Sequence, residues 1–285
     1  MPFVLNEGDI TLSSQLLICA PFLFFLGIPH GAIDNILFLR DNQIKNWEFI
    51  GVYLAIIGFN IVLWVVLPSI AYILFLLLSA YHFGQSQFSH YADKHSLVYK
   101  ALYFFWGISI LAGLVYFNIG EIQLLMNDQD EFAVLSSLHE ESTMLHTFLS
   151  ATIITFGLMV FLTIKNSLNL EALLMETLVI ALVLICFYLM PLLIGFTLYF
   201  VILHSFKVLR EEYMFLNAKK EVSSIGNFVK LVAPFTLLSI GGIALLFGLI
   251  YLDILTLPYG YLLLIVISSI TLPHVFVMNR FYRLT

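Results

Sequence analysis

Four of the eight histidines lie inside apolar stretches, where a polar imidazole is rare: His30, His82, His204 and His274. Neutral imidazole is the commonest metal ligand in proteins, and burial favours that neutral form. A set of nitrogen ligands suits iron, copper or zinc better than magnesium or calcium. The pattern therefore favours a single metal ion held by one histidine from each of four helices. Hydrogen bonding between helices and a proton relay are the alternatives.

Polar neighbours of these histidines could orient the imidazole rings. Asp34 follows His30 by four residues, which is one turn along the same face of a helix. Its carboxylate could accept a hydrogen bond from a metal-binding imidazole and so fix the orientation of the ring, or it could lie at the membrane interface. Gln85 and Gln87, which follow His82, could act in the same way with less charge.

The composition requires a membrane setting for these residues. Of the 285 residues, 61% are hydrophobic and 11% are charged, which is less than half the charged share of an ordinary soluble domain. This excludes a water-soluble enzyme, a secreted disulfide scaffold and a disordered chain. The net charge of −6 and the scattered basic residues also argue against a nucleic acid as a partner.

Hydropathy predicts an all-α fold, a polytopic transmembrane helical bundle of about nine (eight or nine) spans. A spanning helix needs about 20 mainly apolar residues, and nine segments qualify: 12–39, 47–67, 69–88, 97–117, 143–164, 171–189, 191–208, 226–252 and 258–278. The boundary at Met190-Pro191 could be a turn between two spans or a kink within one helix. With no linker or repeat, residues 1–285 are expected to form a single integral membrane domain.

The basic residues predict the orientation. With nine spans and the N-terminus outside, all 12 Lys and Arg lie on or next to the inner side, while the outer segment 118–142 carries acids and neither Lys nor Arg. This partition predicts an N-out, C-in topology. The four apolar-stretch histidines then come to similar depths, because they lie near the inner ends of the first, third, seventh and ninth spans.

The sequence lacks the motifs of several enzyme classes. It contains no G-x-G-x-x-G, P-loop, G-x-S-x-G or H-E-x-x-H motif, so no nucleotide fold, catalytic triad or zincin is indicated. The histidine boxes of membrane di-iron enzymes are also missing, which again favours one metal ion.

At its histidine motifs the chain resembles the Brp/Blh family of membrane β-carotene 15,15′-dioxygenases, which are bacterial and archaeal enzymes. The matching blocks are GIPHGAID at 27–34, HFG at 82–84, LHS at 203–205 and LPH at 272–274. The resemblance implies a multi-helix enzyme of the cell membrane that holds one Fe(II) through histidines. It would use O₂ to cleave the central double bond of β-carotene into two all-trans-retinal molecules, and it implies a functional link to a microbial rhodopsin.

The resemblance carries iron-ligand roles to His30, His82 and His204. The chain departs from the family one turn after His204, where Val208 stands in the place of a further histidine ligand, and Gln87 occupies a position often held by Asp. His274 is the remaining histidine at the right depth, and we expect it to complete the iron site. Three histidines with water, or an impaired enzyme, are the alternatives.

Two further classes of function compete with the dioxygenase. One is a non-catalytic membrane protein that binds a carotenoid or retinal, or a transporter with a histidine relay. The other is a haem protein with two axial histidines. If the ligand missing at position 208 matters, Val208→His should preserve or raise activity.

Overall fold

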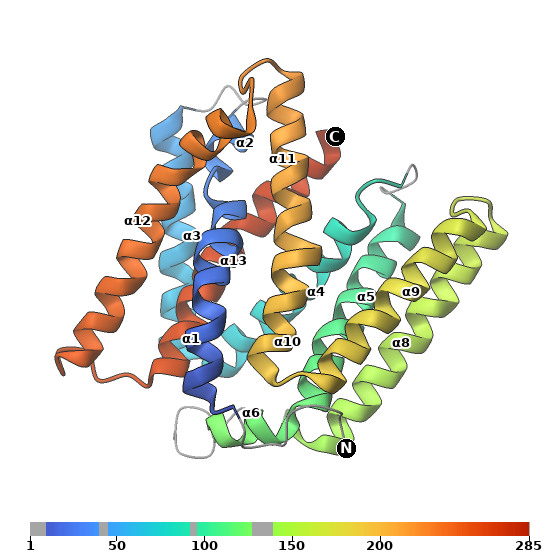
Figure 1. Ribbon diagram of the computed structural model, residues 1–285, viewed down its shortest axis with the longest axis horizontal. Helices are drawn as coiled ribbons and strands as arrows, with labels where there is room; N and C mark the ends of the chain where they lie inside the picture. Colours follow the sequence, from blue (N-terminus) through green and yellow to red (C-terminus); the bar gives the residue numbers. More distant parts are fainter. Residues whose placement is uncertain (1–9, 40–44, 92–95, 127–138, 285) are drawn as a thin grey trace. The chain divides into compact units, whose positions relative to one another are not determined.

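The computed structural model describes residues 10–39, 45–91, 96–126 and 139–284, and within them the chain is helical, with no strand (Figure 1). This confirms the predicted all-α class. Eight helices or helical stretches in these residues are long and apolar enough to cross a membrane, which agrees with the expected eight or nine spans: Leu12–Leu39, Asn46–Val66, Leu97–Phe117, Glu141–Ile164, Leu170–Leu189, Leu192–Ala218, Ile225–Tyr251 and Gly260–Arg283.

The remaining expected span, 69–88, corresponds to helix α4 (Pro68–Phe88), which is long enough but less apolar than the other eight. Its second half contains His82, Gln85, Ser86 and Gln87, and these polar residues lower its hydropathy. The N-out, C-in topology depends on whether α4 spans the membrane, and it stays a prediction. Arg40 and Lys94, two of the basic residues behind that prediction, lie outside the described residues.

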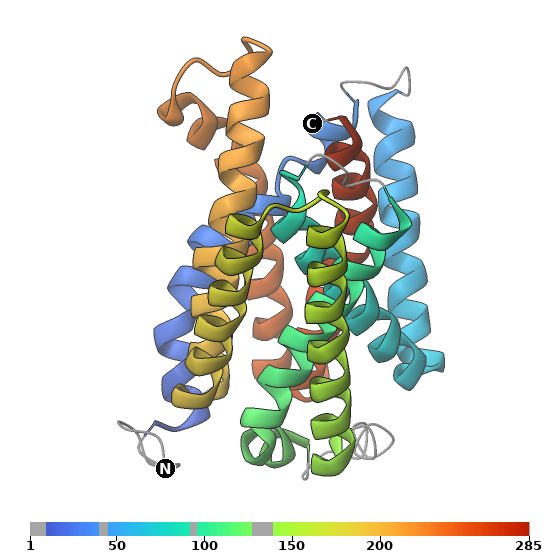
Figure 2. The ribbon, with the colours of Figure 1, turned by 90° about the vertical axis from the view of Figure 1, so that its right-hand side faces the viewer.

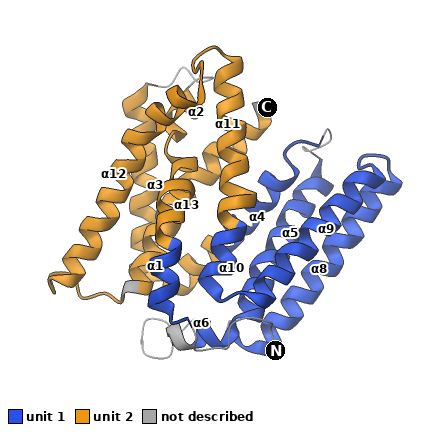
Figure 3. Cartoon of the chain, viewed as in Figure 1, with its two compact units in different colours: residues 1–19, 76–199 blue, residues 20–75, 200–285 orange. Residues whose placement is uncertain are grey.

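The chain divides into two compact units that alternate along the sequence (Figure 3). Unit 1 comprises residues 1–19 and 76–199, and unit 2 comprises residues 20–75 and 200–285. Whether the whole chain acts as a single membrane domain stays a prediction.

In unit 1, the helices α5 (Leu97–Phe117), α8 (Glu141–Ile164) and α9 (Leu170–Leu189) pack side by side (Figures 1 and 2). Two short helices, α6 (Ile119–Met126) and α10 (Leu192–Leu198), pack against α5. The break at Met190-Pro191 is a turn between α9 and α10, and the Glu121 carboxylate accepts hydrogen bonds from Gln15 (2.9 Å) and from the backbone N–H of Leu192 (3.4 Å). A carboxylate at the start of α10 compensates the partial positive charge of its N–H groups.

Unit 2 contains α3 (Asn46–Val66), which packs against α13 (Tyr259–Leu284), and α12 (Ile225–Tyr251). Polar side chains join α3 to α13, because Asn60 and Trp64 both donate to the Ser268 hydroxyl, at 2.9 and 2.7 Å. Such hydrogen bonds are a common means of association between membrane helices.

The part of unit 2 that leads to the histidines departs from α-helical geometry at three places. Helix α1 (Leu12–Phe22) continues as the π-helix η1 (Leu23–Gly27) and the 3₁₀-helix η2 (Ile28–Gly31), followed by α2 (Asp34–Leu39). A second π-helix, η4 (Tyr199–Ser205), leads into α11 (Phe206–Ala218). Short π segments within helices occur frequently at functional sites.

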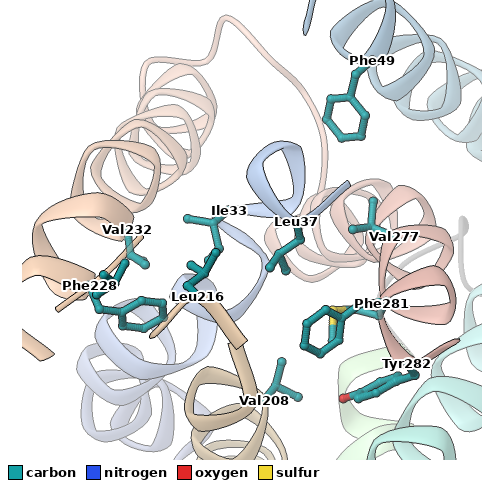
Figure 4. Close-up of a cluster of buried hydrophobic side chains, with 12 residues drawn as sticks. Ile33, Leu37, Phe49, Val208, Leu216, Phe228, Val232, Val277, Phe281 and Tyr282 are labelled. Carbon is teal, nitrogen blue, oxygen red and sulfur yellow. The ribbon is translucent and has the colours of Figure 1, made fainter. Parts of the chain in front are cut away.

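An apolar cluster of unit 2 surrounds the end of α2 and one face of α11 (Figure 4). Its buried members come from five helices and two connecting segments: Ile33, Leu37, Phe49, Val208, Leu216, Val222, Phe228, Val232, Val277, Met278, Phe281 and Tyr282. Ile33 comes directly before Asp34, so the cluster anchors the segment that carries His30 and Asp34.

Within unit 1, the backbones of α4 and α5 come into direct contact through two glycines. A Cβ at Gly107 would lie 1.8 Å from the Ala80 carbonyl oxygen, and one at Gly84 would lie 2.0 Å from that of Tyr103. Any side chain at these positions would force the two helices apart.

We therefore expect Gly107→Ala to destabilise the protein by about 1–3 kcal/mol, as overpacking does elsewhere. The measurement is the thermal unfolding midpoint of the purified protein in detergent. Gly157→Ala on α8 is the control, because open space surrounds that glycine and alanine favours a helix. Equal midpoints for the two variants would contradict the close contact of α4 and α5.

Candidate metal centre

His30 lies in η2, where Pro29 and the preceding π-helix turn its side chain out of regular α-helical register. The ring is buried, and its Nδ1 forms a hydrogen bond with the Gly27 carbonyl oxygen. A carbonyl can only accept, so Nδ1 is the donor and carries the proton. In the neutral ring the lone pair then lies on Nε2, which is the state in which imidazole binds a metal.

His204 lies in η4, and its ring centroid is 5.1 Å from that of His30, with the ring planes almost perpendicular at 84°. Phe200, four residues earlier, stacks on the His204 ring at 5.5 Å and meets His30 edge to face at 5.4 Å. This phenylalanine therefore restricts the rotation of both imidazoles on one side.

His274 lies in α13, directly after Pro273, and its ring centroid is 4.9 Å from that of His30. Its Nδ1 lies 2.9 Å from Oδ1 of Asp34. A carboxylate accepts, so Nδ1 donates and the lone pair again lies on Nε2. Gly31 permits this approach, because a Cβ there would lie 3.3 Å from His274 Nδ1.

Asp34 begins α2 and is buried in unit 2. Its second oxygen, Oδ2, accepts a hydrogen bond of 3.0 Å from the Tyr53 hydroxyl of α3. The sequence placed Asp34 one α-helical turn from His30, but the segment between them is a 3₁₀-helix followed by a turn, and the carboxylate bonds to His274. An aspartate held at both oxygens can fix the orientation of an imidazole.

Sequence reasoning missed two polar residues near His30 and Asp34. The Ser205 hydroxyl lies 3.4 Å from His30 Nδ1, and Tyr53 lies in a span whose sequence gives no sign of its contact with Asp34. Ser205 is adjacent to His204 and could have been proposed from the sequence. Tyr53 could not, because its contact depends on how α3 packs.

The other predicted site residues belong to unit 1. His82 and Gln85 are buried on α4. Gln87, near the end of the same helix, donates through Nε2 to Oε2 of Glu176 on α9 at 2.8 Å. Unit 2 by itself therefore brings together His30, His204, His274 and Asp34, while His82, Gln85 and Gln87 are placed by the packing of unit 1.

The ring centroids of His204 and His274 each lie about 5 Å from that of His30. Two of these three buried rings, His30 and His274, donate a hydrogen bond through Nδ1. The three imidazoles can therefore present nitrogen lone pairs to one ion. A set of nitrogen ligands suits iron, zinc or copper. The residues present thus fit a metal ion better than a network of hydrogen bonds alone.

The fold and these histidines define a polytopic helical membrane protein with a histidine-rich site. The model of one protein family, described as beta-carotene 15,15′-dioxygenase, matches residues 22–282. The chain therefore belongs to the β-carotene 15,15′-dioxygenase family, as its resemblance to the Brp/Blh proteins indicated. No curated protein and no solved structure gives a significant match.

Proposed function

We propose that this protein is an iron-dependent membrane dioxygenase that cleaves β-carotene at its central 15,15′ double bond and releases two molecules of all-trans-retinal. The observation that carries the proposal is the meeting of three buried imidazoles in unit 2 of a chain that belongs to this family. Both oxygen atoms of O₂ enter the two aldehydes, so the reaction needs neither a nicotinamide nor a flavin.

The proposed iron ligands are His30, His82, His204 and His274. His30, His204 and His274 are supported by their proximity in unit 2, and His82 by its place in the HFG motif and its burial. His274 takes the place of the family ligand that is missing at Val208. Bound Fe(II) would supply the activation of O₂, which organic side chains cannot perform.

The protein residues around the proposed iron orient the ligands and keep water away. The Gly27 carbonyl holds the proton of the His30 ring at Nδ1, and the Asp34 carboxylate does the same for His274. The Tyr53 hydroxyl donates a hydrogen bond to Asp34 and so fixes the carboxylate. Phe200 covers two of the rings with an apolar surface. β-Carotene dissolves in the lipid bilayer, so a site built within membrane helices gives the substrate direct access from its own solvent.

The setting that we propose is the cell membrane of a bacterium or an archaeon, where the protein is embedded as a multi-pass enzyme. Its product, retinal, would then supply a microbial rhodopsin. β-Carotene, O₂ and the lipid bilayer are its proposed partners.

Co-expression in a bacterium that makes β-carotene tests the proposed function. We expect the cells to lose their colour, chromatography to show retinal, and the purified protein to contain about one iron per chain by elemental analysis. Addition of an Fe(II) chelator should stop turnover, and Fe(II) should restore it. Unchanged carotene together with correctly inserted protein would reject the proposal. Pigment retained without turnover and without iron would favour a carotenoid-binding protein, and a Soret band would indicate haem.

The burial of Val208 changes what we expect from adding a histidine there. Val208 is fully buried in the apolar cluster, where it comes together with Leu37 and Phe281 (Figure 4). Val208→His should therefore lower stability by about 1–3 kcal/mol through overpacking and should not raise the rate of retinal formation. Val208→Leu is the control for added volume without polarity. A Val208→His variant with higher iron content and faster turnover would show that His274 does not complete the site.

A further inference from the structure

A carboxylate lies buried within α9, a helix that is otherwise almost entirely apolar. Glu176 is 4% exposed and lies inside the candidate membrane span Leu170–Leu189. A carboxylate in a membrane helix is costly and is normally found with partners and a function. Neither the proposed iron ligands nor the residues that orient them in unit 2 account for Glu176.

The partners of Glu176 come from the end of α4 and the segment after it, all within unit 1. Gln87 Nε2 donates to Oε2 at 2.8 Å, and the Tyr91 hydroxyl donates to Oε1 at 2.9 Å. Burial, and then the neighbouring Glu176, raise the pKa of the Tyr91 hydroxyl above its ordinary value, so this group keeps its proton and remains a donor. One carboxylate oxygen therefore binds the C-terminal end of α4, and the other binds the segment that follows it.

Helix α4 is fixed at a second place by its contact with α5. The two glycine contacts, at Ala80 and at Gly84, lie two residues before and two residues after His82. They set the distance between the helices on both sides of His82. Sliding of α4 along α5 or rotation of α4 would bring backbone atoms into collision.

The attachment to Glu176 extends this contact toward the C-terminal end of α4. Gln87 follows Ala80 by seven residues and Gly84 by three, so at about 100° per residue its side chain lies about 20° and 60° from these two positions, on the side of α4 that meets α5. Gln87 follows His82 by five residues, which at 3.6 residues per turn places the two side chains about 140° apart around the helix. A hydrogen bond at Gln87 therefore holds one side of α4 toward α9 and turns His82 away from it. The glycine contacts and the carboxylate thus hold the same side of α4 at successive turns, and together they fix its rotation.

We propose that Glu176 is a positioning residue that holds the C-terminal end of α4 in a fixed rotation and thereby helps to set the direction in which His82 presents its imidazole to the iron. This inference rests on the proposed function, in which His82 is an iron ligand.

The experiment compares Glu176→Leu with Glu176→Gln, Gln87→Leu and Tyr91→Phe in the full-length protein. The control is Glu171→Leu, which removes an exposed carboxylate from the first turn of the same helix. For each variant, the Fe(II) dissociation constant is measured by chelator competition, kcat and KM by retinal formation, and the thermal unfolding midpoint in detergent. The electron paramagnetic resonance spectrum of the Fe(II) protein treated with nitric oxide reports the geometry of the ligands.

We expect Glu176→Leu to weaken Fe(II) binding about tenfold, the lower end of the effect of residues that support metal ligands. It should lower kcat by a similar factor, leave KM for β-carotene unchanged and alter the resonance spectrum. Glu176→Gln, which keeps one acceptor oxygen, should have a smaller effect. Adding Gln87→Leu to Glu176→Leu should weaken iron binding little further, because both changes break the same contact. Glu171→Leu should match the unmodified protein.

Unchanged iron affinity and an unchanged spectrum in folded Glu176→Leu would overturn the inference. If that variant does not fold, Tyr91→Phe and Gln87→Leu decide, since each removes one hydrogen bond, and normal iron affinity in both would overturn it equally. His82→Ala separates this failure from failure of the proposed function. If His82→Ala loses iron binding while the Glu176 variants keep it, only the positioning role is rejected. If His82→Ala binds iron normally, His82 is rejected as a ligand.

Discussion

His30→Ala should abolish retinal formation and reduce the iron content of the purified protein to background. His30 is the ring that both His204 and His274 approach, at 5.1 and 4.9 Å between centroids, so its removal opens the centre of the site. Loss of a residue that hydrogen-bonds to a metal ligand already lowers metal affinity or activity about 10–100-fold. Loss of the ligand itself should cost at least the upper value. Retinal is measured by chromatography and iron by elemental analysis on the same sample.

The matched control for this prediction is His146→Ala. His146 is an exposed histidine of α8 whose Nδ1 bonds to the Ser142 carbonyl of the same helix, so its loss should leave iron and turnover unchanged. Retention of full activity and iron by His30→Ala would remove His30 from the proposed ligand set and, with it, the metal centre in unit 2.

Asp34→Asn should lower iron affinity and kcat by about 10–100-fold while the protein still folds. The aspartate accepts a hydrogen bond at each oxygen, from His274 Nδ1 and from the Tyr53 hydroxyl. An asparagine has one acceptor oxygen and an NH₂ group, so one of these buried donors would face another donor. The unmet donor should cost about 1–3 kcal/mol of stability. Iron titration, steady-state kinetics and thermal unfolding measure the three effects.

Tyr53→Phe is the comparison for Asp34→Asn. It removes one hydrogen bond to Asp34 but leaves the bond between Asp34 and His274, so the loss of activity should be several-fold smaller. Equal losses in the two variants would show that the orientation of His274 is not what Asp34 contributes.

The sequence was sufficient to predict the class of fold and the proximity of several histidines. Long apolar segments determine helices in a membrane, and the predicted topology places four histidines at corresponding ends of parallel spans, which suggests a common depth. The structure brings His30, His204 and His274 together in one unit, as that reasoning expected, although their role as iron ligands stays a proposal.

The partners of the polar side chains could not be predicted from spacing. The i, i+4 rule assumes a continuous α-helix, and between His30 and Asp34 the chain forms a 3₁₀-helix and a turn. Gln87 bonds to Glu176, which lies 89 residues further along the chain, and the spacing between Gln87 and His82 does not reveal this partner. Contacts of this kind follow from which helices pack together, and local periodicity carries no information about them.

The π-helix η4 determines the direction, around the helix axis, in which the side chains of α11 point. A π-helical turn contains about one residue more than an α-helical turn, and each residue of an α-helix advances the chain by about 100°. The buried side chains Val208, Glu212 and Leu216 repeat every four residues on one face of α11, while Phe206 and Met214 are exposed. Deletion of one residue from η4 would restore a regular helix and rotate that face by about a quarter turn relative to the segment before it. The extra residue thus rotates α11 relative to the segment before η4. Because of this rotation, one continuous helix can point His204 in one direction and the apolar face of α11 in another.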